Sequence, residues 1–162
     1  MNAMATSEPA AKRNPVTIER TDLEVVVKRT FDAPARLVFD AWTKPELMRK
    51  WWAPRSMGMT IQSLEMDART GGHYRLNFGE GMDFHGTYLE VTPHSRIVWT
   101  NAEAGDDASV TTVTLEQRDG KTYLVMSERF PSKEAFEAGA GAEDATHETF
   151  AQLDDLLAEL AA

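Results

Sequence analysis

The clearest helical pattern of the chain lies at its C-terminal end. From Ala142 to Leu160, apolar or small residues recur every three or four positions, which is typical of one face of an α-helix. That face comprises Ala142, Thr146, Phe150, Leu153, Leu157 and Leu160, and the opposite, polar face comprises Asp144, Glu148, Gln152, Asp155 and Glu159. The pattern predicts one long amphipathic helix that packs its apolar face on the rest of the molecule.

Most of the preceding chain has the composition and alternation of β-strands. A valine-rich run, Leu23–Phe31, predicts the first strand. Six more are predicted at Met57–Asp67, His73–Phe78, Met82–Thr92, Ser95–Asn101, Ser109–Arg118 and Lys121–Arg129. The Asp119-Gly120 pair between the last two is a strong hairpin signal. Short turns between consecutive strands favour antiparallel pairing.

Two short helices are predicted directly after the first strand. Asp32 precedes Ala33-Pro34, which indicates an acidic cap at the start of a helix over Arg36–Thr43. A second short helix begins at Pro45. Helices segregated to one face of an antiparallel sheet make an α+β fold. Residues 1–15 have no hydrophobic period and are expected to form a flexible leader, and residues 16–162 to form a single domain.

Charge and composition exclude several classes of function. The 162 residues carry a formal net charge of −9 with a pI of about 4.9, which argues against nucleic acid and anionic membranes as partners. The chain has no cysteine, so disulfides and thiolate chemistry are excluded. No apolar run reaches the length of a transmembrane helix, and the N-terminus lacks a secretion signal. A cytoplasmic protein without membrane insertion is expected.

Several local motifs, in this order, resemble one known family. They are Arg29 to Pro34, Val38 to Glu46, the Trp51-Trp52 pair with Pro54, Met66 to Arg69 with Gly71-Gly72, Phe84 to Tyr88, Ile97 to Thr100, Glu128 to Phe130, and Glu148 to Leu157. The chain resembles the START-like (SRPBCC) superfamily with its helix-grip fold, and within it the branch related to the activator of heat-shock protein 90 ATPase. The resemblance implies a curved antiparallel sheet of about six to seven strands wrapped around the long C-terminal helix.

The same resemblance implies a cavity between sheet and helix. Pockets are mostly apolar with a few polar groups. The residues expected to line it are Trp52, Tyr74, Leu76, Phe84, Trp99, Met126, Glu128, Ala142, Thr146 and Phe150. The alternative is that the aromatic residues among them form only the core. Small residues at the start of the long helix, Ala142, Ala145 and Thr146, predict a larger or more polar cavity than a bulky residue would leave.

The candidates for acid/base chemistry are Glu65, Asp67, Glu128 and Arg129, and Glu128 is the one expected to face the cavity. It has the strand parity of Leu124 and Met126, so it is expected on the cavity side of its strand, where a carboxylate can act as general acid or base. The alternative is a buried ion pair with Arg69 or Arg75. No nucleophile elbow, phosphate loop or dinucleotide fingerprint occurs in the sequence.

No cofactor and no metal are expected. The strand alternation that turns Tyr74 and Phe84 inward turns His73 and His85 outward, so the histidines are not expected to converge.

The superfamily includes lipid carriers, polyketide cyclases, plant ligand binders and co-chaperone domains, so the fold alone does not select a function. Three hypotheses follow. The first is a carrier or sensor of a hydrophobic or aromatic small molecule, the second a cyclase-like or hydrolase-like enzyme with a pocket carboxylate, and the third a chaperone-activator-like interaction module. The resemblance also leaves a homodimer open.

Overall fold

The computed structural model describes residues 13–58, 60–79, 83–101, 108–138 and 141–161, and an eight-stranded antiparallel sheet dominates it. Its strands are β1 (Thr17–Thr21), β2 (Glu24–Phe31), β3 (Ser63–Met66), β4 (His73–Asn77), β5 (Asp83–Thr92), β6 (Arg96–Asn101), β7 (Ser109–Arg118) and β8 (Lys121–Arg129). The helices are α2 (Ala35–Thr43), α3 (Pro45–Met48), α4 (Lys133–Ala138) and α5 (Thr146–Ala161), with 3-10 turns η2 (Arg55–Met57) and η4 (Ala142–Ala145).

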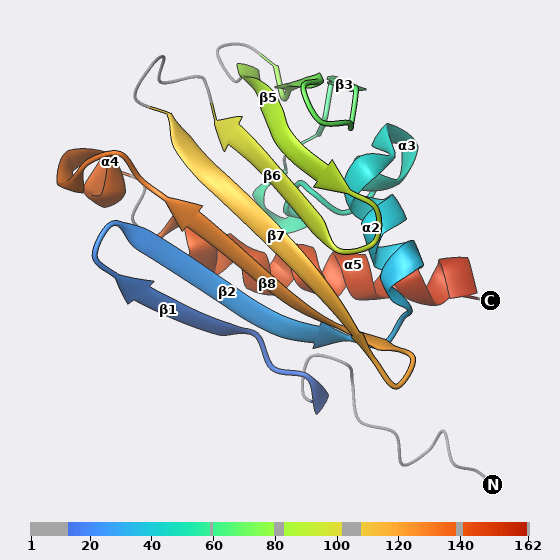
Figure 1. Ribbon diagram of the computed structural model, residues 1–162. Helices are drawn as coiled ribbons and strands as arrows, with labels where there is room; N and C mark the ends of the chain where they lie inside the picture. Colours follow the sequence, from blue (N-terminus) through green and yellow to red (C-terminus); the bar gives the residue numbers. More distant parts are fainter. Residues whose placement is uncertain (1–12, 59, 80–82, 102–107, 139–140, 162) are drawn as a thin grey trace, which may run out of the picture.

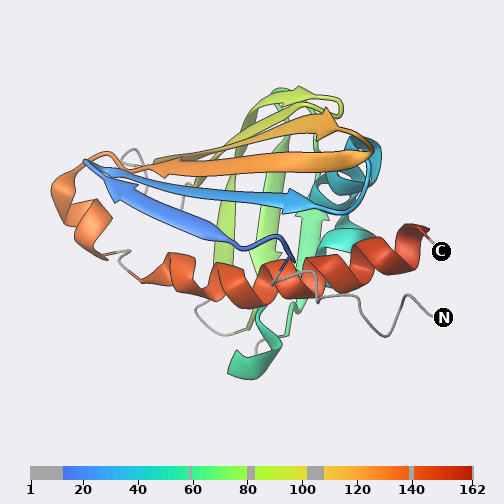
Figure 2. The same ribbon diagram turned by 90° about the horizontal axis from the view of Figure 1, so that it is seen from below.

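The strand order β1-β2-β8-β7-β6-β5-β4-β3 brings the first strands of the chain beside the last one (Figure 1). Every pairing is antiparallel, as predicted. Figure 2 shows the sheet curling, so that β3, β4 and β5 turn across the direction of β1, β2 and β8. Helix α5 runs along the inner side of this curve. The predicted α+β fold, a curved sheet around a long C-terminal helix, is confirmed.

The core lies where α5 and α2 meet the sheet. Phe150 of α5 and Phe31 of β2 are almost fully buried, and their rings meet edge to face with centroids 5.1 Å apart. Trp42 of α2 and Trp51 pack in the same way, 4.7 Å apart. Burying one such side chain stabilises a fold by about 1.5–3 kcal/mol relative to leaving it in water. These aromatic contacts therefore account for much of the attachment of both helices to the sheet.

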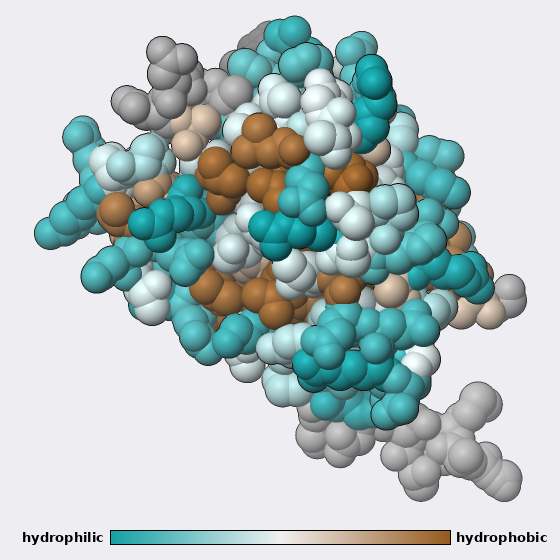
Figure 3. All heavy atoms as spheres, viewed as in Figure 1, coloured by the Kyte–Doolittle hydropathy of each residue, from teal (hydrophilic) through white to brown (hydrophobic). Residues whose placement is uncertain are grey.

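The other face of the sheet alternates valine with hydroxyl side chains. Register partners there include Val98 with Thr112, Val125 with Thr114, and Val26 with Ser127. This is the face turned towards the viewer in Figure 3, where hydrophobic areas are separated by polar ones. In the part of the chain that the structure describes, no helix is long and apolar enough to cross a membrane.

Four details of the predicted elements need correction. The sheet has eight strands rather than six to seven, because residues from Thr17 on pair with β2 as an edge strand. The predicted strand Met57–Asp67 is instead η2, a connecting segment and the short β3. Asp32 does not cap α2: the capping position is Pro34, without a side-chain hydrogen bond. Asp32 instead forms ion pairs with Arg13 and Lys121.

The fourth correction concerns α5. The α-helix begins at Thr146, and the residues from Ala142 form a 3-10 turn before it. Gln152, predicted on the polar face, is buried together with Leu153 and Leu156. The buried stripe is thus wider than a strict apolar pattern indicates, because a polar side chain with enough hydrogen-bond partners can be buried as well. The predicted leader, residues 1–15, lies mostly outside the described residues.

Candidate functional site

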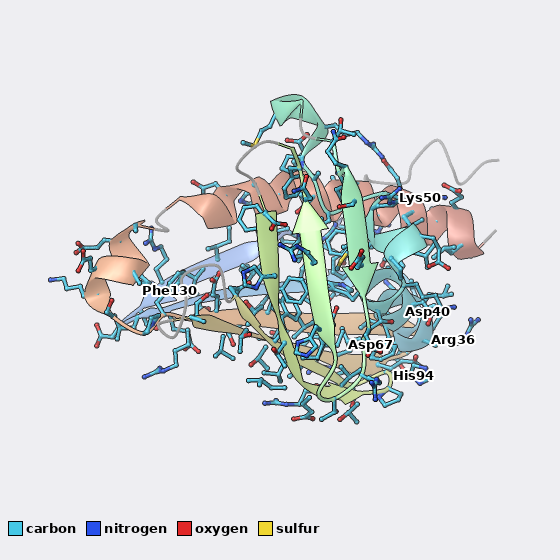
Figure 4. All side chains as sticks on the ribbon, turned by 90° about the horizontal axis from the view of Figure 1, so that it is seen from above. Arg36, Asp40, Lys50, Asp67, His94 and Phe130 are labelled. Carbon is cyan, nitrogen blue, oxygen red and sulfur yellow. The ribbon has the colours of Figure 1, made fainter. Side chains whose placement is uncertain are left out.

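A cavity of about 250 Å³ lies between the inner face of the sheet and the start of α5. Strands β2, β6, β7 and β8 supply most of its wall, and Trp52 and Thr146 close it from the side of the helices. The described residues that line it are Val25, Val27, Trp52, Trp99, Asn101, Thr111, Met126, Glu128, Phe130 and Thr146. Phe130 marks its end nearest α4 (Figure 4), where its ring meets Phe136 with centroids 5.5 Å apart.

A second hollow of about 380 Å³ adjoins the first. Trp52, Met126 and Thr146 line both, so these three side chains form the partition between them. The remaining lining residues of the second hollow are Trp42, Trp51, Pro54, Met57, Phe78, Ala145, Thr149 and Phe150. Both hollows are mainly apolar, which is the usual character of a small-molecule site.

All four tryptophans of the chain gather at this place. Trp52 lies 5.7 Å from Trp42 and 6.4 Å from Trp99, measured between ring centroids. Trp51 is fixed by a hydrogen bond of 2.9 Å from its Nε1 to the carbonyl oxygen of Ala41. Trp42 and Trp51 are almost fully buried, whereas Trp52 is only half-buried. Two tryptophans thus support the wall from behind, and Trp52 presents its ring to the cavity.

The polar wall of the cavity is a directed chain of hydrogen bonds. Nε1 of Trp99 donates to Oδ1 of Asn101 at 3.3 Å, which leaves the amide nitrogen of Asn101 to donate to Oγ of Ser109 at 3.0 Å. The same nitrogen donates to Oγ1 of Thr111 at 3.0 Å. Ser109 in turn donates to Oε2 of Glu128 at 2.6 Å. A hydroxyl that donates to a carboxylate makes a short hydrogen bond, and this one ends the polar wall at Glu128.

Tyr74 reaches the same chain from β4. Its hydroxyl donates to the carbonyl oxygen of Thr100 at 2.9 Å and lies 3.3 Å from Oδ1 of Asn101. The ring can cross β5 because Gly86 is its register partner: a Cβ there would lie 2.7 Å from the Tyr74 ring and 1.9 Å from the Thr100 carbonyl oxygen. Gly86 therefore makes room for the ring that supports Asn101.

The loop that carries Trp52 is bound to α5 by Gln152. Nε2 of Gln152 donates to the carbonyl oxygens of Trp51 and Ala53 at 3.0 and 2.9 Å, and Oε1 accepts from the backbone nitrogen of Arg55 at 3.0 Å. One turn earlier, Glu148 accepts from the backbone nitrogen and the hydroxyl of Ser56. The hydrogen bonds from Ser56 lower the pKa of Glu148 below its ordinary value. Two side chains of α5 thus fix the cavity wall that precedes β3.

The structure brings together five of the ten residues proposed for the pocket. Trp52, Trp99, Met126, Glu128 and Thr146 line the first cavity, and Phe150 lines the adjoining hollow. Tyr74 and Leu76 border a smaller space of about 40 Å³ behind Trp52 and Trp99. Phe84 packs on Phe78, 5.8 Å between centroids, and is not among the described residues lining these spaces. The side chain of Ala142 lies outside the described part of the structure.

Sequence reasoning missed the polar residues that orient Glu128. Asn101, Ser109 and Thr111 come from the facing ends of β6 and β7, and only their pairing shows that they meet. Arg69 and Arg75, the two ion-pair partners considered for Glu128, pair with other carboxylates: Arg69 with Asp67, and Arg75 with Asp83. Alternation along β7 could have placed Ser109 and Thr111 inward, with Val113 and Leu115.

Among the described residues, no group of three or more histidine, aspartate or glutamate side chains is placed to hold a metal ion. His73 lies 3.2 Å from the hydroxyl of Thr87, and His94 packs against Phe39 at 5.4 Å between centroids. His94 lies at the other end of the molecule from Phe130 (Figure 4). The cavity is therefore described by its carboxylate, its amide and hydroxyl groups and its aromatic rings.

A long helix held in a curved antiparallel sheet, with a hollow between them, defines the helix-grip class of the SRPBCC superfamily. The family model described as activator of Hsp90 ATPase homolog 1-like protein matches residues 32–162. The chain belongs to this family. A search of curated proteins returned no match.

Solved structures of bacterial proteins share the fold. A crystal structure from Rhodobacter sphaeroides has 25% sequence identity and a TM-score of 0.77, over 90% of this chain and 99% of the other. A crystal structure from Nitrosomonas europaea has 24% identity and a TM-score of 0.76, over 88% and 99%. One from Chromobacterium violaceum has 27% identity and a TM-score of 0.67, over 83% and 96%.

Proposed function

We propose that this protein binds a hydrophobic or aromatic small molecule between the sheet and α5, as a carrier or sensor in the cytoplasm. The observation that carries the proposal is the apolar cavity of about 250 Å³ with one short polar wall. Small-molecule pockets usually measure about 300–1,000 Å³. The volume, with the adjoining hollow at Trp52, favours a ligand with one or two aromatic rings. Neither nucleic acid nor membrane insertion forms part of the proposal.

A catalytic role would depend on Glu128. It lines the cavity, and the hydrogen bond from Ser109 fixes one of its oxygens, so it is positioned to take a proton from a bound molecule. A cyclase-like or hydrolase-like reaction is therefore the second candidate. If a substrate is found and Glu128→Gln turns it over as fast as the wild type, this residue is not the base.

The family description names a chaperone activator, and that role is the third candidate. A docking surface for a protein partner usually contains exposed hydrophobic side chains. Among the described residues, the large hydrophobic side chains that are clearly exposed are Met57 and Leu89, on separate elements. Stimulation of chaperone ATPase activity by the purified protein would favour this candidate over ligand binding.

The test of the main proposal is direct binding to the full-length chain. Native mass spectrometry of freshly purified protein shows whether a small molecule co-purifies. Titration with the neutral fluorescent probe N-phenyl-1-naphthylamine is expected to saturate at one probe per chain. Thr146→Phe is expected to weaken probe binding at least about tenfold, because Thr146 borders both hollows and cavity sites lose affinity when filled.

Thr114→Phe is the matched control for that variant. Thr114 lies on β7 but on the outer face of the sheet, so the same substitution leaves the cavity unchanged and probe binding is expected to stay as in the wild type. Absence of any saturable probe binding, together with absence of a co-purified molecule, would overturn the proposed function. Equal weakening by both variants would place the probe outside the cavity.

A further inference from the structure

The charge of the cavity indicates what kind of ligand fits it. Among the described residues that line the cavity and the adjoining hollow, Glu128 is the only one with an ionisable side chain. No lysine, arginine or histidine of the described residues lines either space. A carboxylate or phosphate on a bound molecule would therefore face a like charge in a mainly apolar surrounding, where such repulsion is strong.

The direction of the hydrogen bonds leads to the same conclusion. An indole nitrogen can only donate, so Trp99 fixes the carbonyl oxygen of Asn101 towards itself and the amide nitrogen towards Ser109. Ser109 accepts from that nitrogen, and its own proton points to Glu128. The hydrogen bonds from Trp99 to Asn101, from Asn101 to Ser109 and from Ser109 to Glu128 are thus all donated in the direction of Glu128, whose carboxylate accepts. A carboxylate can accept several hydrogen bonds, and Ser109 is one donor to Glu128.

The rings beside this carboxylate complete a site for a positive charge. Trp52 and Trp99 line the same cavity as Glu128, with ring centroids 6.4 Å apart and planes inclined at 68°. The two rings meet edge to face, and both border the cavity. A cation that lies over the face of an indole ring, within about 6 Å of its centroid, is attracted by it. Cation sites built from aromatic rings and a carboxylate recognise alkylammonium groups by this combination.

We infer that the ligand is an aromatic or hydrophobic amine in its ammonium form, bound with the charged nitrogen against Glu128 and its apolar part along Trp52 and Trp99. The inference rests on the proposed binding function and specifies its ligand class. Protons of the ammonium group would donate to the carboxylate beside Ser109. The net charge of −9 attracts cations to the molecule as a whole and adds to the selection.

The test compares three molecules that share one ring system and differ in charge. They are 2-(1-naphthyl)ethylamine, 2-(1-naphthyl)ethanol and 1-naphthylacetic acid, each used to displace N-phenyl-1-naphthylamine from the full-length protein. The amine is expected to bind at least about tenfold more tightly than the alcohol, and the acid most weakly, because a desolvated cation–π contact and a charge-assisted hydrogen bond both favour the ammonium group.

Glu128→Gln separates charge recognition from folding. The substitution keeps the size of the side chain and an oxygen for Ser109, so the variant is expected to fold and to lose most of the preference for the amine, measured as the ratio of the affinities for the amine and the alcohol. Glu116→Gln removes the same charge from an exposed, ion-paired position on β7 and is expected to change nothing. Trp52→Leu is expected to weaken the amine more than the alcohol, which tests the aromatic half of the site independently.

The outcomes distinguish the inference from the function on which it rests. If the alcohol and the probe bind but the amine gains nothing over the alcohol, ligand binding stands and the amine preference is wrong. A preference for the amine that survives in Glu128→Gln also overturns the inference. If none of the three molecules binds and the probe does not bind, the binding function and the inference fall together.

Discussion

Arg29 on β2 donates a hydrogen bond of 2.7 Å from its Nη1 to Oδ1 of Asp154 on α5. The arginine side chain is 1% exposed, and the aspartate side chain is 16% exposed. The same Nη1 lies 3.3 Å from the carbonyl oxygen of Phe150, and Nε donates to the carbonyl oxygen of Asn14. A single buried guanidinium thus joins the sheet, the last helix and the segment before β1. The guanidinium also lies 4.8 Å from the ring centre of Phe31.

Arg29→Met is expected to lower the free energy of unfolding by about 3–5 kcal/mol, because it leaves the carboxylate of Asp154 partly buried without its cation. Burial raises the pKa of Asp154 above its ordinary value, and the hydrogen bond from Arg29 opposes that rise. Urea unfolding at neutral pH measures the effect. The double variant Arg29→Met with Asp154→Leu should recover part of the loss, and a single-variant loss below about 1 kcal/mol would contradict the assigned role.

Gln152→Leu is expected to loosen the loop that carries Trp52. The substitution leaves two backbone carbonyl groups and one backbone N–H without their partner, and leaving such groups unsatisfied costs about 1–3 kcal/mol each where they are buried. The expected loss in the free energy of unfolding is about 2–4 kcal/mol. This is less than the full cost of three buried groups, because part of this loop is open to water. Hydrogen exchange should accelerate in the segment from Trp51 to Gly58.

Gln62→Leu makes the same substitution at an exposed position and serves as the control. Its exchange pattern and stability should stay close to those of the wild type. Wild-type exchange rates at residues 51–58 in Gln152→Leu would show that the loop is held by its own packing and not by α5.

The fold was predictable from sequence because its strongest signals are local. Alternation defines the strands from β4 to β8, and the helical period of α5 survives although Thr146 and Gln152 interrupt its apolar face. β1 was missed as a full strand because it is short and largely exposed, so no hydrophobic pattern marks it. Asp32 was misassigned because an acidic residue before Ala-Pro fits a helix cap, whereas two distant cations, Arg13 and Lys121, decide its position.

The site was less predictable because its polar wall depends on strand pairing. Glu128 could be placed inward from its own strand, but its partner Ser109 lies nineteen residues earlier on β7, and the register decides that they meet. Gln152 looked like a surface residue because its hydrogen-bond partners are backbone groups of a loop about a hundred residues earlier. Contacts of this kind leave no periodic signal in the sequence.

Thr146→Met is expected to fill space at the partition between the two hollows. The longer apolar side chain should reduce the volume of both and weaken N-phenyl-1-naphthylamine binding, because Thr146 lines each of them. Filling a cavity commonly stabilises a protein by about 0.5–2 kcal/mol, which for a chain of this size raises Tm by about 2–4 °C per kcal/mol. Unchanged probe affinity with unchanged Tm would contradict the assignment of Thr146 to the cavity wall.

Asp32→Asn is expected to lower stability at neutral pH and to have no effect in acid. Burial acts to raise the pKa of Asp32, but hydrogen bonds from Arg13 and Asn14 outweigh it, with the charge of Lys121 adding to them, and the pKa lies below its ordinary value. A carboxylate whose pKa is lower in the folded state contributes stability that is present above the unfolded pKa of about 3.9 and lost as the pH falls through the folded pKa. The expected loss at pH 7 is a few tenths to about 1 kcal/mol, because the pair lies near the surface.

The measurement is urea unfolding of wild type and Asp32→Asn at pH 7 and again near pH 3. The difference between the two proteins should be largest at pH 7 and should shrink as the wild-type carboxylate takes up its proton. Asp22→Asn removes a fully comparable charge from an exposed turn between β1 and β2, so it controls for the change in net charge. A stability difference for Asp32→Asn that is the same at both pH values would mean that Asp32 acts through its hydrogen bonds to Arg13 and Asn14 alone, which an asparagine partly retains, and not through its charge.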